Sequence, residues 1–203
     1  MHICMVAFTD LRFDARVYRE AAALQDAGYR VTIVATTFAP EPLPSWQRFE
    51  THLIPVDRTR SLRLTYPAFW WRARRLLESL AADVYHAHDL DALWPAARAA
   101  VRRGVWLVYD SHELWTEQSG VVSRPVIQLF WRRLEQRLTK QVRHTITVSE
   151  GVRRALQTRY RLDRVTVLRN LPRYREPVSS NRIREALGLH DERRLVLYQG
   201  GFL

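Results

Sequence analysis

The order of apolar and polar residues constrains the fold of this chain most strongly. Five apolar runs each end at a short group of reactive or hydrogen-bonding side chains: residues 2–8 at Thr9-Asp10, 84–87 at His88-Asp89, 105–109 at 110–113, 145–148 at Ser149-Glu150-Gly151, and 165–168 at Arg169-Asn170. In an open parallel sheet the carboxyl ends of the strands share one edge, and ligands bind in the crevice there. The pattern therefore predicts that residues scattered along the chain meet at one site.

Amphipathic segments alternate with the apolar runs, which predicts an α/β fold: a Rossmann-like parallel sheet with helices on both faces. Two further strands are expected at residues 30–35 and 52–56. Helical spacing of apolar residues predicts helices over 14–27, 66–82, 90–103, 127–142 and 151–160. Pro95 should lie near a helix start or kink the helix, and Pro40, Pro42 and Pro44 should enforce a loop.

The pattern of apolar and polar residues changes after Asn170. Residues 1–170 are predicted to form a Rossmann-like N-terminal domain, and 171–180 a linker. Residues 181–203 are expected to hold a short helix over 182–187, a strand over 194–199 and a glycine turn. We interpret them as the first elements of an incomplete second domain.

Composition and charge narrow the class of protein. Cys4 is the only cysteine, so we expect a buried thiol and no internal disulfide. Neither a signal peptide nor a membrane-spanning stretch is expected, which favours a cytoplasmic location. The net charge of +11 should attract anions such as nucleotide phosphates or acidic lipids. Nucleic acid is not an expected partner, because no nucleic-acid-binding motif accompanies the charge.

The segment from Asp10 to Arg16 joins the first strand to the first helix. The start of that helix could hold a phosphate through free N–H groups and the helix dipole. In the alternative interpretation Asp14 caps the helix, and Arg16 is solvated or paired.

His86 and His88 should point to the same face of their strand, because side chains alternate. Together with Asp89 and His112 they could be imagined as a metal site, but the spacing fits no structural zinc motif. We therefore predict no metal, with His86 a packed, hydrogen-bonded interior residue and with His88 and Asp89 shaping the crevice.

His112 follows a buried strand directly and is the strongest catalytic candidate. It could hydrogen-bond a ligand hydroxyl or present its backbone carbonyl to a sugar, and Glu113 could tune its pKa. The alternative is that His112 caps the following loop. Ser149 is predicted to cap the helix that begins at this same edge.

Basic and aromatic residues interleave between residues 58 and 75, as in a helix that lies on an anionic membrane. The alternative is a core helix with a solvated basic face. The arginines of the stretch include Arg58 and Arg60, and the candidate membrane contacts are Trp70, Arg72, Arg74 and Arg75.

Five segments, in order, resemble the N-terminal half of a GT-B glycosyltransferase of family 4: residues 14–32, 83–89, 107–114, 147–152 and 167–172. Residues 198–201 look like the first strand of that family's C-terminal domain. The resemblance implies two Rossmann-like domains that face a cleft. The N-terminal domain would bind the acceptor, and the C-terminal domain the sugar nucleotide.

The resemblance also implies a mechanism and roles for single residues. Transfer is usually retaining, needs no metal and uses no cofactor, because the nucleotide-diphosphate sugar is a substrate. His112 matches the family's active-site histidine near the transferred sugar. Residues 9–11 match the loop near the donor phosphates, although many members have glycines where this chain has none. The family's basic pair and glutamate pair would lie beyond Leu203, so the chain by itself is expected to be inactive.

We therefore expect a glycosyltransferase that moves a hexosyl group from a nucleotide sugar to a saccharide or lipid-linked acceptor. A peripheral position on the inner face of the cell membrane is the alternative to a purely cytoplasmic one. His112 would be catalytic, and the substrate-binding residues would be Thr9, Asp10, His88, Asp89, Glu113, Ser149 and Asn170. Two alternatives stay open. One is a nucleotide-sugar epimerase or phosphorylase of the same architecture. The other is a noncatalytic binding module for anionic glycans or nucleic acid.

Overall fold

A computed structural model describes residues 1–38, 46–57, 59, 61–171, 174, 176–190 and 192–198. Seven strands form one sheet in the order β3-β2-β1-β4-β5-β6-β7, and every neighbouring pair is parallel. The strands are β1 (His2–Asp10), β2 (Arg30–Thr37), β3 (Glu50–Pro55), β4 (Val84–His88), β5 (Trp106–Ser111), β6 (His144–Thr147) and β7 (Val165–Val167). The predicted Rossmann-like sheet is confirmed.

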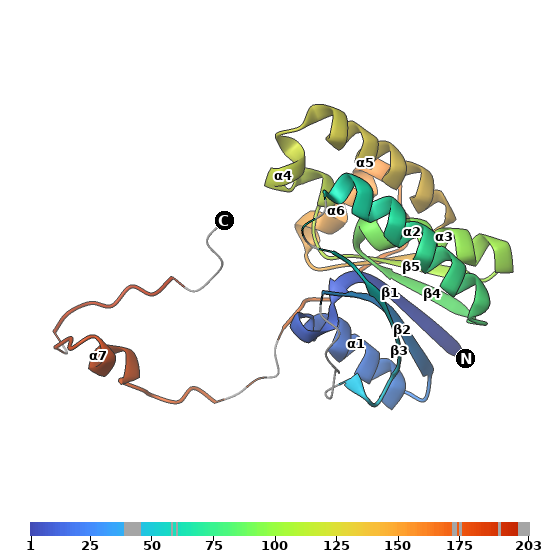
Figure 1. Ribbon diagram of the computed structural model, residues 1–203. Coiled ribbons are helices and arrows are strands. Elements are labelled where there is room, and N and C mark those ends of the chain that lie inside the picture. The colour runs from blue at the N-terminus through green and yellow to red at the C-terminus, as the bar shows by residue number, and fades with distance from the viewer. Residues whose placement is uncertain are drawn as a thin grey trace. The chain divides into compact units, whose positions relative to one another are not determined.

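Helices pack on both faces of the sheet, as predicted (Figure 1). The larger part of the core lies between the sheet and helices α2 (Leu62–Ser79), α3 (Asp89–Arg103) and α5 (Pro125–Leu138). The smaller part lies on the opposite face, under α1 (Ala15–Asp26). The remaining helical segments are α4 (Ser119–Val122), α6 (Glu150–Tyr160), α7 (Arg182–Ala186), and the short 3₁₀ segments η1 (Leu11–Phe13), η3 (Trp115–Glu117) and η4 (Thr139–Gln141). None of the helices in the described residues is both long and apolar enough to cross a membrane.

Two caps and a buried thiol confirm local predictions. Asp14 caps α1 by accepting a hydrogen bond from the Val17 backbone N–H at 3.0 Å. Ser149 caps α6 in the same way, with Val152 N–H as the donor at 3.3 Å. Cys4 is fully buried in β1, and this burial raises the pKa of its thiol to about 12. The thiol is therefore protonated at neutral pH.

Pro95 lies inside α3 and does not end it. A proline has no N–H for the carbonyl four residues earlier, which here belongs to Asp91. The indole Nε1–H of Trp70 donates to that carbonyl at 2.6 Å. The side chain of one helix therefore replaces the hydrogen bond that the other helix lacks.

Several helix boundaries in the structure differ from the predicted ones. Helix α2 begins at Leu62, four residues before the predicted start, because the Ser61 hydroxyl caps it by accepting from Arg63 N–H at 3.4 Å. Helix α5 begins at Pro125, a residue that suits a first helical turn. The segments η1, η3 and α4 were not predicted, since three or four residues carry little helical periodicity.

The chain divides into two compact units, Met1–Asn170 and Leu171–Leu203. The strand expected over 194–199 is wrong for the described residues 194–198, which form neither strand nor helix. An apolar run becomes a strand only when it pairs with another, and the sequence after Asn170 offers no other predicted strand. Pro40, Pro42, Pro44 and residues 199–201 lie outside the described residues. The assignment of residues 181–203 to a donor-binding domain stays a prediction.

A matched pair of substitutions in α3 tests the larger core. Leu93 is fully buried, whereas Val101 on the same helix is 58% exposed. We expect Leu93→Ala to lower the free energy of unfolding by about 2–5 kcal/mol, because it removes buried methyl groups and leaves a cavity. Val101→Ala should change it by less than about 0.5 kcal/mol. Urea denaturation measures both, and equal effects would contradict this packing.

Candidate active site

The candidate site lies at the carboxyl edge of the sheet, where β4 and β5 end. His88 is the last residue of β4 and pairs with Asp110 of β5, and Asp89 and His112 follow close after these two strands. Strand order reverses direction between β1 and β4, which is the place where ligands bind in doubly wound sheets. The strand that ends at His88 is predicted to lie beside the strand that contains Tyr109. This prediction is confirmed, with Ala87 beside Tyr109.

His112 is held between two carboxylates. Its Nδ1 lies 3.0 Å from Asp89 Oδ2, and its Nε2 lies 3.2 Å from Asp110 Oδ2. Its backbone N–H also donates to Asp89 Oδ1 at 2.9 Å. The ring remains 19% exposed, so it is fixed in place but reachable from the edge.

Burial alone would lower the pKa of His112, but hydrogen bonds and charges from Asp110 and Asp89 outweigh it and raise this pKa to about 10. At neutral pH the ring is therefore an imidazolium. Glu113 is not among the main causes of this shift in pKa, and its expected influence stays a prediction. The Glu113 carboxylate instead accepts a hydrogen bond from the Gln118 side chain at 2.7 Å.

Asp110 is the centre of the network. It is completely buried, and it accepts hydrogen bonds from Arg16 Nη2 at 2.7 and 2.9 Å. Burial opposes ionisation, but hydrogen bonds from His112 and His88 lower the pKa of Asp110 well below its usual range. Arg16 also donates from Nε to Glu20 at 3.0 Å, so a single arginine joins α1 to β5. Of the two interpretations of Arg16, the paired one is confirmed.

Asp89 adopts an unusual backbone conformation at this point. Its φ angle is 63°, in the left-handed region that asparagine and aspartate tolerate best among residues other than glycine. Residues held in such conformations cost about 1–3 kcal/mol and cluster at functional sites. Here the turn at Asp89 brings its carboxylate to both the ring and the backbone of His112.

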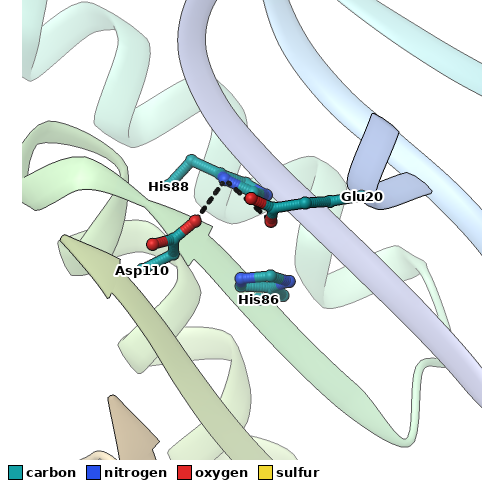
Figure 2. Close-up of side chains that lie close together, drawn as sticks. All are labelled: Glu20, His86, His88 and Asp110. Atoms are coloured by element: carbon teal, nitrogen blue, oxygen red, sulfur yellow. Dashed lines mark ion pairs between the residues drawn. The ribbon is translucent and has the colours of Figure 1, made fainter. Parts of the chain in front are cut away.

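His86 and His88 lie on one face of β4, as predicted, with ring centroids 4.3 Å apart (Figure 2). His88 Nδ1 lies 3.3 Å from His112 Nε2 and 3.5 Å from Asp110 Oδ2. His86 is buried, but its Nε2 has no hydrogen-bond partner in the described part of the chain, so the prediction that its ring is fully hydrogen-bonded is wrong at this atom.

The loop after β1 is closed by its own side chains. Asp10 is buried, and its carboxylate accepts from Arg12 N–H, from the Arg12 guanidinium and from Phe38 N–H. The hydrogen bond from the Arg12 side chain is the main reason that the pKa of Asp10 falls to about 2. Asp10 therefore fastens the loop to the end of β2. Thr9 lies beside it on β1, half-buried.

Two other predicted site residues make contacts elsewhere. Ser149 serves as a helix cap, and the Asn170 side-chain oxygen accepts a hydrogen bond from Arg19 of α1. In the described residues, neither side chain has a hydrogen bond or ion pair to His112. A role in substrate binding for these residues and for Thr9 stays a prediction.

The candidate membrane contacts of α2 each have a contact within the protein, and their role at a membrane stays a prediction. Trp70 is partly buried, stacks with Trp94 and lines an apolar groove of about 630 Å³. Arg74 pairs with Glu78 at 2.7 Å, Arg72 donates to the Pro55 carbonyl, and Arg75 lies over the Trp71 ring. Arg58 and Arg60 are outside the described residues.

The groove lies between α2 and the segment from η3 to α5. Arg63 and Arg124, both exposed, are its basic lining residues, and Trp115, three residues after His112, also lines it. Its aromatic and aliphatic lining includes Tyr66, Trp70, Trp115, Val121, Ile127, Phe130 and Trp131. The sequence pattern showed the aromatic residues of α2. It could not show that they line one groove with residues of α5, which are some sixty residues away in the chain.

Comparison with known proteins identifies the family. The family described as Glycosyltransferase Family 4 matches residues 15–171. The chain belongs to this family. Its N-terminal unit has the Rossmann-like architecture of one half of a GT-B fold. No curated protein matches the chain.

Solved structures share this fold at low sequence identity. Sucrose-phosphate synthase from Thermosynechococcus elongatus is 14% identical with a TM-score of 0.65, and the match covers 95% of this chain and 53% of that one. The lipopolysaccharide outer core galactosyltransferase WaaB is 10% identical with a TM-score of 0.59, covering 85% and 46%. UDP-GlcNAc 2-epimerase from Methanocaldococcus jannaschii is 10% identical with a TM-score of 0.58, covering 82% and 45%. The chain therefore spans about half the length of these proteins.

The protonation state of His112 can be tested by NMR. Because its folded-state pKa of about 10 exceeds the ordinary value of 6.5, the imidazolium stabilises the fold below about pH 6.5. That stabilisation is lost as the pH rises through about 10. We expect the ring of His112 to titrate far above 7 in the wild type. Asp89→Asn should lower this pKa, since asparagine keeps the left-handed turn but removes the charge. Titration of wild-type His112 near 6.5 would contradict the assignment.

Proposed function

We propose that this chain is the acceptor-side half of a glycosyltransferase that moves a hexosyl group from a nucleotide-diphosphate sugar to a saccharide or lipid-linked acceptor. The observation that carries the proposal is the His112 ring held between the carboxylates of Asp89 and Asp110 at the strand-order reversal. Membership of family 4 supports the reaction class. The nucleotide would be bound mainly by a second Rossmann-like domain, and transfer would retain anomeric configuration, as the resemblance implies.

The chemistry of transfer suits a fixed cation at this edge. When the glycosidic bond to the diphosphate breaks, negative charge develops on the leaving group, and preorganised charges stabilise it best. With a pKa near 10, His112 is a poor general base at neutral pH, so its role would be electrostatic and positional. Asp110 and Arg16 lie beneath it and keep its ring in place. They would act as positioning residues.

Release of UDP or GDP from a panel of nucleotide sugars, in the complete protein with candidate acceptors, tests this role. We expect His112→Ala to lower kcat about 10²–10³-fold, the usual cost of losing one stabilising group. The control His52→Gln changes a histidine of β3 whose hydrogen-bond partner is Glu50, away from the site. In Asp89→Asn the alkaline limb of the pH profile should move to lower pH. Full transferase activity of His112→Ala would refute this role of His112.

An epimerase is the second candidate, supported by the likeness to UDP-GlcNAc 2-epimerase. The same assay separates the two functions. A transferase releases nucleotide in proportion to glycosylated acceptor, whereas an epimerase converts the nucleotide sugar to its epimer without needing an acceptor. Epimer formation at the rate of nucleotide-sugar loss would favour the second candidate.

We also propose that the groove holds the apolar part of a lipid-linked acceptor at an anionic membrane surface. The support is its aromatic lining, its closeness in sequence to His112 through Trp115, and the exposed Arg63 and Arg124 among its lining residues. Three of its apolar lining side chains are exposed: Leu62 of α2, and Val126 and Phe130 of α5.

Sedimentation with phosphatidylglycerol vesicles tests the surface. We expect binding that weakens as salt rises. Each arginine near an anionic surface contributes about 1 kcal/mol, so Arg63→Gln with Arg124→Gln should weaken binding by more than about tenfold. Arg72→Gln with Arg75→Gln is the matched control, because neither of these exposed arginines lines the groove. Equal binding to phosphatidylcholine vesicles, or an equal loss of vesicle binding in both double variants, would contradict the proposal that the groove faces an anionic membrane.

A further inference from the structure

Four potential metal ligands meet behind the candidate active site, on the face of the sheet that α1 covers. Figure 2 shows them: Glu20 from α1, His86 and His88 from β4, and Asp110 from β5. One ligand atom from each lies within 4.8 Å of the other three. The backbone explains the meeting. His86 and His88 are two residues apart on one strand, and Asp110 is the registered partner of His88.

The hydrogen bonding of this cluster is incomplete. Glu20 Oε2, His86 Nε2 and His88 Nε2 are all buried and have no hydrogen-bond partner among the described residues. Buried polar side-chain atoms nearly always have a partner, so three such atoms on members of the cluster point to a ligand. The nitrogen of His88 that faces the carboxylates is Nδ1, which lies 3.9 Å from Glu20 Oε2 and 3.5 Å from Asp110 Oδ2. His86 and His88 are 5% and 2% exposed, which leaves little access to bulk water.

The charges of the cluster suit a cation. Three carboxylates lie in and beside the cluster, those of Glu20, Asp89 and Asp110, against the two cations Arg16 and His112. When all three are ionised, the surplus is one negative charge.

Arg16 contacts both oxygens of Asp110 but only one oxygen of Glu20. Its guanidinium binds Glu20 through Oε1, which leaves Oε2 for another ligand. A contact of this kind orients a metal-binding carboxylate, as outer-shell hydrogen bonds commonly do. The same positive charge weakens cation binding, so the site is not expected to reach the affinity of an all-anionic one.

We propose that Glu20, His86, His88 and Asp110 bind one divalent transition-metal ion of the zinc type. Two imidazoles with carboxylates suit Zn²⁺ and its neighbours, whereas Mg²⁺ and Ca²⁺ prefer oxygen ligands alone. Ligand atoms around a tetrahedral zinc lie roughly 3.4 Å apart, given bonds of about 2.1 Å. The four ligand atoms, which lie within 4.8 Å of one another, would therefore move closer together on binding.

The metal would be structural. The four ligands are buried or nearly so, and such a site has no open position for substrate. It would fasten α1 to β4 and β5, next to the residues that hold His112. This differs from the arrangement set aside in the sequence analysis, which paired the two histidines with Asp89 and His112.

The test uses untagged protein, stripped with chelator and titrated with Zn²⁺. Calorimetry and elemental analysis after gel filtration should show one zinc per chain, with a rise in Tm. His86→Gln and Glu20→Gln should each weaken binding at least about tenfold, since even outer-shell losses cost that much. His190→Ala is the control, because His190 is exposed and lies outside the cluster.

Circular dichroism shows whether the two variants still fold. If they do not fold, Co²⁺ binding to the wild type tests the site instead. Inner-sphere nitrogen and oxygen ligands give bound Co²⁺ a visible absorption, and one equivalent of Zn²⁺ should remove this absorption by displacing the Co²⁺. Substoichiometric zinc in the folded wild type, zinc binding that His86→Gln and Glu20→Gln leave unchanged, or the absence of such absorption would overturn the proposal.

Discussion

The buried ion pair between Arg16 and Asp110 is the interaction on which the rest of the site depends. Asp110 is completely buried, and a buried charge without a partner is very costly. Arg16 provides the partner from the opposite layer of the fold, 94 residues away in sequence. Removing either member of such a pair typically costs about 3–5 kcal/mol, because the other charge is left alone. The pair thus fixes α1 against β5 and keeps Asp110 ionised, and the ionised Asp110 in turn keeps His112 charged.

The sheet topology decides where that charge is displayed. Because β4 and β5 are parallel neighbours, their carboxyl ends place Asp89 and His112 on one rim, beside the end of β1. The left-handed turn at Asp89 gives His112 a second carboxylate, so both ring nitrogens are held. The rigid strands beneath limit the motion of the ring. The apolar groove is lined by Trp115, only three residues farther along the chain than His112.

The sequence was sufficient to predict the strands and helices whose apolar residues recur at a regular spacing. Alternating apolar runs predicted the parallel sheet, and polar residues at the ends of those runs predicted that His88, Asp89 and His112 would share an edge. Sequence could not reveal the partners of those residues. Asp110 was passed over as part of a strand end, Arg16 was expected to lie near a phosphate or to be solvated or paired with no named partner, and Glu20 was given no role. The one available signal was that these two charges are four residues apart and flank the buried Val17 and Ala21. The strand expected over 194–199 failed because a strand needs a neighbour that local sequence does not supply.

The central claim is that Asp89 and Asp110 keep His112 doubly protonated at neutral pH. Neutron diffraction from deuterium-exchanged crystals at pH 7 tests it most directly, because deuterons on ring nitrogens are seen individually. The account predicts deuterium on both Nδ1 and Nε2 of His112, directed at the oxygens of Asp89 and Asp110. A His112 ring with one bare nitrogen, or a deuteron on either carboxylate instead, would contradict it.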